Sequence, residues 1–305
     1  MTKPRADALR QTIRRAKAIA DKDPETAKPL AEQALASLDE NCDALDKADA
    51  LYAKGVAAYR LDDFRAAELA LTEALALYER LGDAADVASA LNAMGNVALA
   101  KGDYPASLDA FQRSLKTWTE IGDSKAIAMG WSNLGNAYYN LSDYPNALDC
   151  HQRALRLREA LGDEREIAAS LNNLGVVYAD CADYESAREV LEKCLKLKAT
   201  FASPSSLAAT YINLGNALRN LGRRSEAKTC YETAKRICEE AGREAGVAIA
   251  AHGLGKLCLD ENAVAQAKTY FSQSIEIFER LGMKREWSLS ALALGKAHSR
   301  VERDD

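Results

Sequence analysis

The sequence has no apolar run that could cross a membrane, because polar residues interrupt every stretch of about 18 residues. Its N-terminus is basic but lacks the apolar segment of a secretory signal. The formal net charge of −5 gives none of the concentrated positive charge that general nucleic-acid binding requires. These three absences predict a protein that binds neither membranes nor nucleic acids, and the scattered thiols described next predict that it is cytoplasmic.

Residues suited to metal or catalytic chemistry are equally sparse. The three histidines, His151, His252 and His298, lie far apart in the sequence and form no metal motif or acid–base pair. The cysteines form no C-x-x-C motif, and such scattered thiols are usually small buried side chains in a reducing compartment. They are Cys42, Cys150, Cys181, Cys194, Cys230, Cys238 and Cys258. The sequence therefore predicts no enzyme, no cofactor and no metal.

Alanine, leucine, glutamate and arginine dominate the composition, whereas proline occurs only 6 times, and this balance favours helix. A glycine within a similar pattern returns every 40 residues, without insertion or deletion. The repeated glycines are Gly55, Gly95, Gly135, Gly175, Gly215, Gly255 and Gly295. A strict period of this length is typical of a repeat array.

Each period contains two apolar patterns of helical spacing, separated by a short turn. The first helix carries the repeated glycine, and an aspartate in the turn is placed to cap the second helix. These aspartates are Asp63, Asp103, Asp143 and Asp183. Glycines then end the second helix, at Gly82, Gly122 and Gly162.

The repeated glycine lies in the middle of the first helix, where it costs about 1 kcal/mol relative to alanine. Its recurrence indicates that bulky groups approach the backbone there. We expect these groups to be a ring at the start of the second helix and the large residues further along it. The candidate rings are Phe64, Tyr104, Tyr144 and Tyr184. His151 occupies the position of Phe111 and Phe271, so we predict that it is a packed ring.

One stretch identifies the repeat. Residues 131–138, Trp-Ser-Asn-Leu-Gly-Asn-Ala-Tyr, match the pattern W-x-x-L-G-x-x-Y of the tetratricopeptide repeat. The basic tetratricopeptide repeat has about 34 residues. The longer repeat here resembles two groups, the animal spindle-orientation adaptors with Leu-Gly-Asn repeats and the sensory regions of bacterial signalling proteins. The resemblance implies an all-α, right-handed superhelical solenoid of tandem helix pairs, with about seven repeats and a final helix.

The repeat frame predicts a single solenoid over residues 1–305. Residues 1–43 form a degenerate leading repeat, in which Arg15 stands where the glycine would be. Residues 44–283 hold six regular repeats, and residues 284–305 supply a first helix without a second. The apolar residues Trp287, Leu289 and Leu292 of this last helix are candidates for self-association. Two alternatives are that a longer protein continues here into an output domain, or that the helix folds back and caps the array.

In tetratricopeptide repeats, the residues three before and one, four and five after the glycine face a concave groove. The resemblance therefore places these residues in a peptide-binding groove: Asn92, Asn96, Asn136, Tyr139, Asn140, Asn172, Asn216, Arg219, Asn220 and Lys256. An asparagine offers a donor and an acceptor, which match a peptide backbone whatever its side chains. Towards the C-terminus the groove becomes basic and aliphatic, which indicates a ligand with an acidic and an apolar part. Asn133 is instead expected to bond the helix backbone of a neighbouring repeat.

These features predict a scaffold, or the sensory part of a signalling protein, that binds a protein or an extended peptide in the groove. The alternative is a structural scaffold that forms a homodimer through its last helix. A third interpretation is that the groove asparagines belong to the repeat consensus and bind no ligand.

Overall fold

The computed structural model describes the backbone of residues 3–38 and 43–304, with side chains from residue 7 to residue 299 in these ranges. These residues form fifteen α-helices and no strand. The helices are α1 Lys3–Ile19, α2 Pro24–Ser37, α3 Ala44–Arg60, α4 Phe64–Leu81, α5 Ala84–Lys101, α6 Tyr104–Ile121, α7 Ser124–Asn140, α8 Tyr144–Leu161, α9 Glu164–Asp180, α10 Tyr184–Lys198, α11 Pro204–Asn220, α12 Arg224–Glu240, α13 Glu244–Asp260, α14 Val264–Arg280 and α15 Lys284–Asp304.

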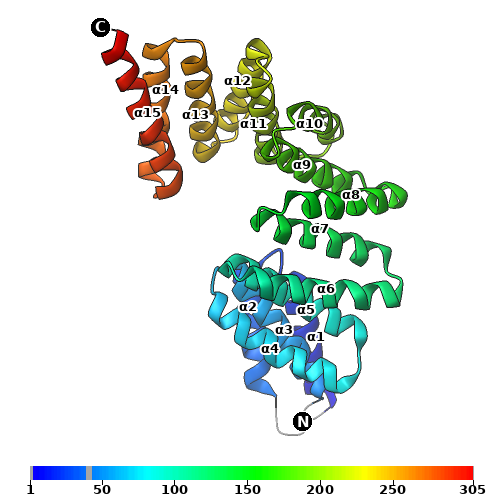
Figure 1. Ribbon diagram of the computed structural model, residues 1–305. Helices are drawn as coiled ribbons and strands as arrows, with labels where there is room; N and C mark the ends of the chain where they lie inside the picture. Colours follow the sequence, from blue (N-terminus) through cyan, green and yellow to red (C-terminus); the bar gives the residue numbers. More distant parts are fainter. Residues whose placement is uncertain (1–2, 39–42, 305) are drawn as a thin grey trace. The chain divides into compact units, whose positions relative to one another are not determined.

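The chain forms two compact units, Met1–Leu157 (unit 1) and Arg158–Asp305 (unit 2), and the division falls within α8 (Figure 1). In unit 1 each helix from α1 to α7 packs on the next, and in unit 2 each helix from α9 to α15 does the same. Within each unit this arrangement confirms the predicted all-α stack of helix pairs. That the array is a single domain over residues 1–305 stays a prediction.

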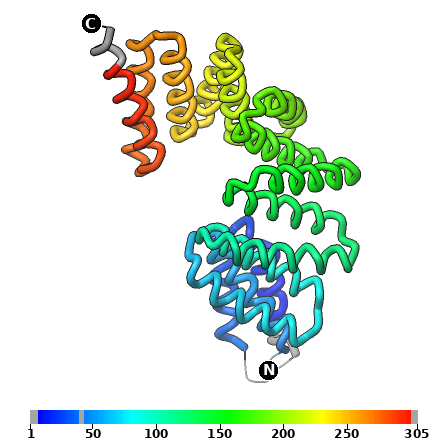
Figure 2. Tube along the Cα trace, in the orientation of Figure 1, coloured from blue at the N-terminus to red at the C-terminus, as the bar shows by residue number. Residues whose placement is uncertain are grey.

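The first helices of neighbouring repeats also contact each other. In unit 1, α3 packs against both α1 and α5, and in unit 2, α11 packs against both α9 and α13. No comparable packing joins α10 to α12 or α12 to α14 in the described part of the chain. Figure 2 shows the yellow-to-red helices of unit 2 side by side. The first helices therefore form the inner face of each unit, where side chains from successive repeats converge.

Each repeated glycine in the six regular repeats admits a large side chain of the second helix. A Cβ added at these positions would lie 2.4 to 2.8 Å from that side chain. The pairs are Gly55 with Leu71, Gly95 with Phe111, Gly135 with His151, Gly175 with Leu191, Gly215 with Tyr231, and Gly255 with Phe271. The expected large residue of the second helix is thus the correct partner, and the ring at the start of that helix is not. His151 is a packed ring, as predicted, and is 1% exposed.

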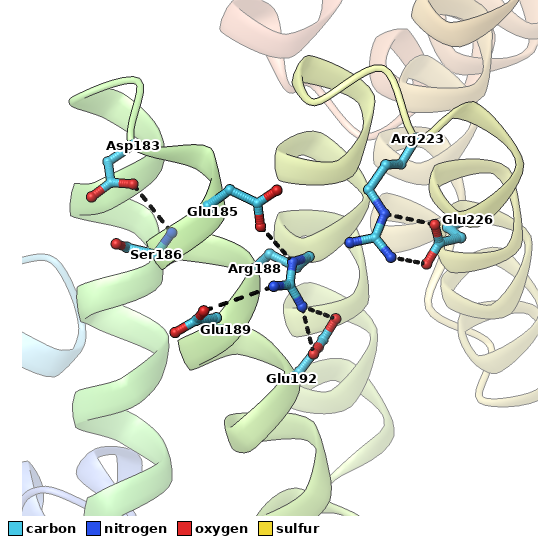
Figure 3. A network of polar contacts seen from close by, with 8 residues as sticks. All are labelled: Asp183, Glu185, Ser186, Arg188, Glu189, Glu192, Arg223 and Glu226. Carbon is cyan, nitrogen blue, oxygen red and sulfur yellow. Dashed lines mark hydrogen bonds and ion pairs between the residues drawn. The ribbon is translucent and has the colours of Figure 1, made fainter.

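The predicted aspartate caps are present in the turns before the second helices. The side chain of the aspartate accepts a hydrogen bond from the backbone N–H of the third helical residue at Asp63, Asp103 and Asp183. Figure 3 shows Asp183 accepting a hydrogen bond from the backbone N–H of Ser186, at 3.2 Å. At the equivalent position one repeat later, Arg223 makes an ion pair with Glu226 (Figure 3), and α12 has no side-chain cap. Asp is therefore not needed at every repeat, because packing holds the later helices.

The predicted role of the cysteines as small buried side chains holds for five of them, Cys150, Cys194, Cys230, Cys238 and Cys258. Cys181 is exposed, so the prediction is wrong for this residue. It lies in the turn between α9 and α10. Cys42 lies outside the described residues.

One buried cation in unit 2 has no carboxylate partner. Lys198 ends α10 and is 8% exposed. Its Nζ donates to the Thr210 hydroxyl, at 2.8 Å, and to the Ser206 carbonyl, at 3.3 Å. Burial lowers the pKa of Lys198, because the charged form loses its hydration and gains only neutral acceptors.

We predict that Lys198→Met raises the free energy of unfolding at neutral pH by about 1 kcal/mol, because a buried charge is replaced by an apolar chain of similar length. The Ser206 carbonyl keeps the Thr210 hydroxyl, 3.1 Å away, as a donor. Since the pKa of Lys198 is lower in the folded state, the wild type gains stability relative to the variant as the pH rises towards about 10.4, the unfolded value. Urea titrations at several pH values check both effects, and a variant less stable than wild type at neutral pH would contradict them.

Candidate functional site

The inner face of unit 1 contains a hollow of about 430 Å³. Its walls come from the turn after α1 and from the first helices α3, α5 and α7. The lining residues are Asp21, Tyr52, Val56, Tyr59, Arg60, Ser89, Asn92, Ala93, Asn96, Met129 and Asn133. Two of the predicted groove residues, Asn92 and Asn96, therefore meet in a concave site.

The hollow combines apolar side chains with amides. Tyr52, Tyr59 and Met129 supply large apolar surfaces. The side chain of Asn96 makes no hydrogen bond within the described residues, so its donor and acceptor are available to a ligand. This pairing of aromatic surface and unpaired amide suits a short extended segment of polypeptide.

Asn92 and Asn133 bind each other across the hollow. The Nδ2 of Asn133 on α7 donates to Oδ1 of Asn92 on α5, at 2.7 Å. Asn133 thus contacts the neighbouring repeat, as predicted, but the expected backbone acceptor is wrong, because the acceptor is a side chain. The bond leaves the Nδ2 group of Asn92 as the group that can donate to a ligand.

The remaining predicted residues of unit 1 lie on α7. The side chain of Asn136 makes no hydrogen bond in the part of the chain that the structure describes, whereas Nδ2 of Asn140 donates to the Asn136 carbonyl, at 2.8 Å. The Tyr139 ring lies against Tyr144, with ring centroids 6.1 Å apart. Asn136 is therefore the second amide with its full bonding capacity free.

The groove amides of unit 2 are engaged within the fold. Oδ1 of Asn216 accepts from the Tyr231 hydroxyl, at 2.8 Å, and Nδ2 of Asn220 donates to the Asn216 carbonyl, at 2.9 Å. Oδ1 of Asn172 lies 3.2 Å from the buried Thr210 hydroxyl. Asn216 is therefore not simply an exposed groove amide. Its loss would leave the hydroxyl of Tyr231, a fully buried residue, without its acceptor.

The positive charges predicted for unit 2 come together on α11 and α13. Nη1 of Arg219 pairs with Asp260, at 2.8 Å, while the Nε–H of Arg219 is buried without an acceptor in the described residues. Nδ1 of His252 lies 2.9 Å from the Ser290 hydroxyl of α15. Burial, and then repulsion from Lys256 and Arg219, lower the pKa of His252 to about 4. His252 is therefore neutral at physiological pH and adds no charge.

Lys256 lies one helical turn after His252 and one turn before Asp260 on α13. It is half-buried and makes no ion pair within the described residues. Burial and the neighbouring Arg219 lower its pKa. The site around Lys256 thus holds more positive than negative charge.

The sequence interpretation missed Tyr52, Tyr59 and Met129. Tyr52 and Tyr59 stand three before and four after Gly55, which are groove positions when the register is applied to that repeat. Met129 stands six before Gly135, one further helical turn along the same face. The register could therefore have found all three.

The three residues predicted for self-association remain on the surface. Trp287 is 40% exposed, Leu289 53% and Leu292 60%. The opposite side of this helix turns towards the core, where Ser290 and Ala297 are buried and Ala293 and Leu294 pack against Cys258 and Phe271. No helix described in the structure has the length and apolar character of a membrane span. The described side chains contain no cluster of histidine, cysteine, aspartate and glutamate suited to a metal ion.

Comparison with known families agrees with the repeat register. Two family models, both described as tetratricopeptide repeat, match residues 126–200 and 206–280, and residues 52–121 and 92–158. Together they span well over half of the chain. The chain belongs to the tetratricopeptide repeat family. No curated protein matches it in sequence.

Solved structures resemble this tetratricopeptide repeat protein in fold. The apo form of RapI is 17% identical, with 90% of this chain and 99% of that chain covered and a TM-score of 0.71. The apo quorum sensor NprR from B. thuringiensis is 15% identical, with 93% and 80% covered and a TM-score of 0.71. A Rap protein complexed with competence and sporulation factor is 13% identical, with 98% and 100% covered and a TM-score of 0.63. At these identities the likeness concerns the fold alone.

Proposed function

We propose that this protein is a non-enzymatic scaffold or sensory module that binds an extended peptide, or an extended segment of a protein, on the inner face of its repeats. The observation that carries the proposal is the hollow of unit 1, where the unpaired amide of Asn96 lies beside Tyr52, Tyr59 and Met129. Asn136, one repeat later at the same position relative to its glycine, offers a second unpaired amide.

The chemistry of these groups favours a peptide over a small rigid ligand. Amides at a regular spacing can pair with successive backbone groups, and aromatic surfaces can cover the side chains between them. Two structural neighbours support a signalling role, because one is named a quorum sensor and another was solved with competence and sporulation factor. A self-associating scaffold is the second candidate, and the exposure of Leu289 and Leu292 favours it.

A peptide selection tests the proposal. We expect the protein to select extended peptides from a displayed library of random dodecamers. The double substitution Asn96→Ala/Asn136→Ala should lower the affinity for the selected peptides at least about tenfold. Both side chains lack partners in the fold, so the melting temperature should change little. Gln33→Ala, which removes an exposed amide from the second helix α2, is the matched control and should bind normally. Full binding by the double variant would show that the asparagines belong only to the repeat consensus.

A further inference from the structure

The inner face of unit 2 differs in chemistry from that of unit 1. Each of its last three first helices carries one or two aliphatic residues and, one or two turns later on the same face, a polar or cationic residue. These sets are Ile212, Asn216 and Arg219 on α11, Ile249 and Lys256 on α13, and Leu289, Leu292 and Lys296 on α15. The helices pack in the order α11, α13, α15, so the sets lie next to one another.

The cationic half of this face carries more positive than negative charge. Asp260 is paired with Arg219, and the half-buried Lys256, which Asp260 also attracts, makes no ion pair of its own within the described residues. Lys296 adds a further positive charge, so Arg219 and Lys296 repel Lys256 while Asp260 alone attracts it. Three cations thus share one carboxylate, which leaves the half-buried ammonium group incompletely neutralised, and a bound anion would reduce that cost.

The aliphatic half is hollow as well as exposed. A depression of about 490 Å³ between α11 and the start of α13 is lined by apolar residues that include Ala208, Ile212, Ile249 and Leu281, and its edge at the α12–α13 turn holds the charged Arg243 and Glu244. On α15, Leu289 and Leu292 stand at the positions that Ile249 and His252 occupy on α13. They therefore continue the row of inner-face residues from α13 onto α15.

We propose that unit 2 recognises a peptide carboxylate at Lys256, flanked by Arg219 and Lys296, together with an aliphatic side chain on the surface of Ile249, Leu289 and Leu292. This inference rests on the proposed peptide-binding function and specifies the ligand for one part of the inner face. Charge complementarity selects the occupant, because the face offers aliphatic surface and three cations against one carboxylate, Asp260, which is already paired with Arg219.

The distance between the aliphatic and the cationic subsite determines how far apart the aliphatic side chain and the carboxylate of the peptide must lie. Ile249 and Lys256 lie seven residues apart on α13, which corresponds to about 10 Å along the helix axis. An extended peptide covers that distance in about three residues. A ligand that lies along α13 therefore carries its aliphatic side chain and its carboxylate about three residues apart.

Peptide titrations followed by NMR test the inference on the full chain. The first probe is acetyl-Gly-Leu-Ala-Ala-Asp-Gly amide, and the second has Asn in place of Asp. A third probe, acetyl-Gly-Leu-Ala-Gly with a free C-terminus, distinguishes a terminal carboxylate from a side-chain carboxylate. We expect one or both carboxylate peptides to shift resonances of α11, α13 and α15, and the Asn peptide to bind at least about tenfold more weakly.

Lys256→Gln should remove the preference for the carboxylate, whereas the control Lys228→Gln, on the outer side of α12, should keep it. Leu289→Ser/Leu292→Ser should weaken all probes and leave sedimentation unchanged. Equal binding of the Asp and Asn peptides would overturn the carboxylate site while leaving peptide binding intact. A wild-type dimer that the double serine variant dissociates would overturn the assignment of Leu289 and Leu292 to the ligand. If no probe shifts unit 2, the inference fails. The proposed function fails separately, if the displayed library yields no peptide.

Discussion

Gly135→Leu is expected to unfold the region around α7, whereas the same substitution at Gly295 leaves the protein at least as stable as wild type. A Cβ at Gly135 would lie 2.7 to 2.8 Å from three atoms of the His151 ring. The ring is buried and cannot move aside without disturbing the core around it. Overpacking of this kind costs about 3 kcal/mol, which is a large part of the stability of a typical domain.

Gly295 supplies a matched control because it occupies the same place in the repeat with open space beside it. No atom of the described residues lies within 4 Å of a Cβ added there. Leucine at this exposed helical position should stabilise the helix by about 0.5–1 kcal/mol through its better helix propensity. Denaturant titrations measure the two effects. Hydrogen exchange should place the damage of Gly135→Leu in α7 and the helices that pack on it.

Equal effects of the two substitutions would contradict this explanation. They would mean that the repeated glycine serves the helix backbone itself and that the ring of the second helix is incidental. Uniform loss of protection along the whole chain would contradict the local character of the damage, because an array of repeats transmits a change mainly to its nearest neighbours.

The periodic features of the fold could be predicted from the sequence because each one recurs. The period of the glycines, the aspartate caps and the glycine at the end of α4 and α6 are local signals, and the structure confirms them. The partner of the glycine could not be assigned in advance. Two large side chains, at nine and sixteen residues after it, satisfied the same pattern, and only the packing of the helix pair selects the second.

For a related reason, the repeat pattern could not predict which groove asparagines form hydrogen bonds within the fold. Asn136 and Asn216 hold equivalent positions. The side chain that packs against the neighbouring glycine, however, is His151 in one repeat and Tyr231 in the other. Only Tyr231 donates a hydroxyl hydrogen bond to its asparagine. Whether an amide is free thus depends on a residue fifteen positions away that the groove register does not include.

In the leading repeat too, the repeat pattern does not predict which side chains bind each other. The ion cluster around Lys17 is the example, and its removal is the second substitution with a large expected effect. Lys17→Met is expected to lower the free energy of unfolding by about 2 kcal/mol, because it removes the partner of two carboxylates. Nζ of Lys17 on α1 pairs with Asp49 of α3, at 2.5 Å, and with Asp86 of α5, at 2.9 Å. It also lies over the Tyr52 and Tyr78 rings, about 5.5 and 5.4 Å from their centroids.

Without Lys17, two mostly buried negative charges face each other across the helix pairs. Their exposed fractions are 19% and 23%, so water screens them only in part, and the cost is smaller than for a fully buried ion. Asp86→Asn added to Lys17→Met should recover part of the loss, since one of the two charges is then removed. Lys22→Met, at an exposed position in the next turn, is the control and should stay within about 0.5 kcal/mol of wild type.

The pH dependence separates this ion cluster from simple packing. Burial lowers the pKa of Lys17, but the hydrogen bonds to Asp49 and Asp86 outweigh it, and the net effect raises the pKa. The stabilisation is therefore fully present below about 10.4, the unfolded value, and is lost as the pH rises through the higher folded value. A difference between wild type and Lys17→Met that stays constant up to high pH would assign the effect to packing alone. Tyr52 lies both beneath Lys17 and in the hollow of unit 1. A loss of the cluster should therefore also lower the affinity for the peptides selected from the displayed library.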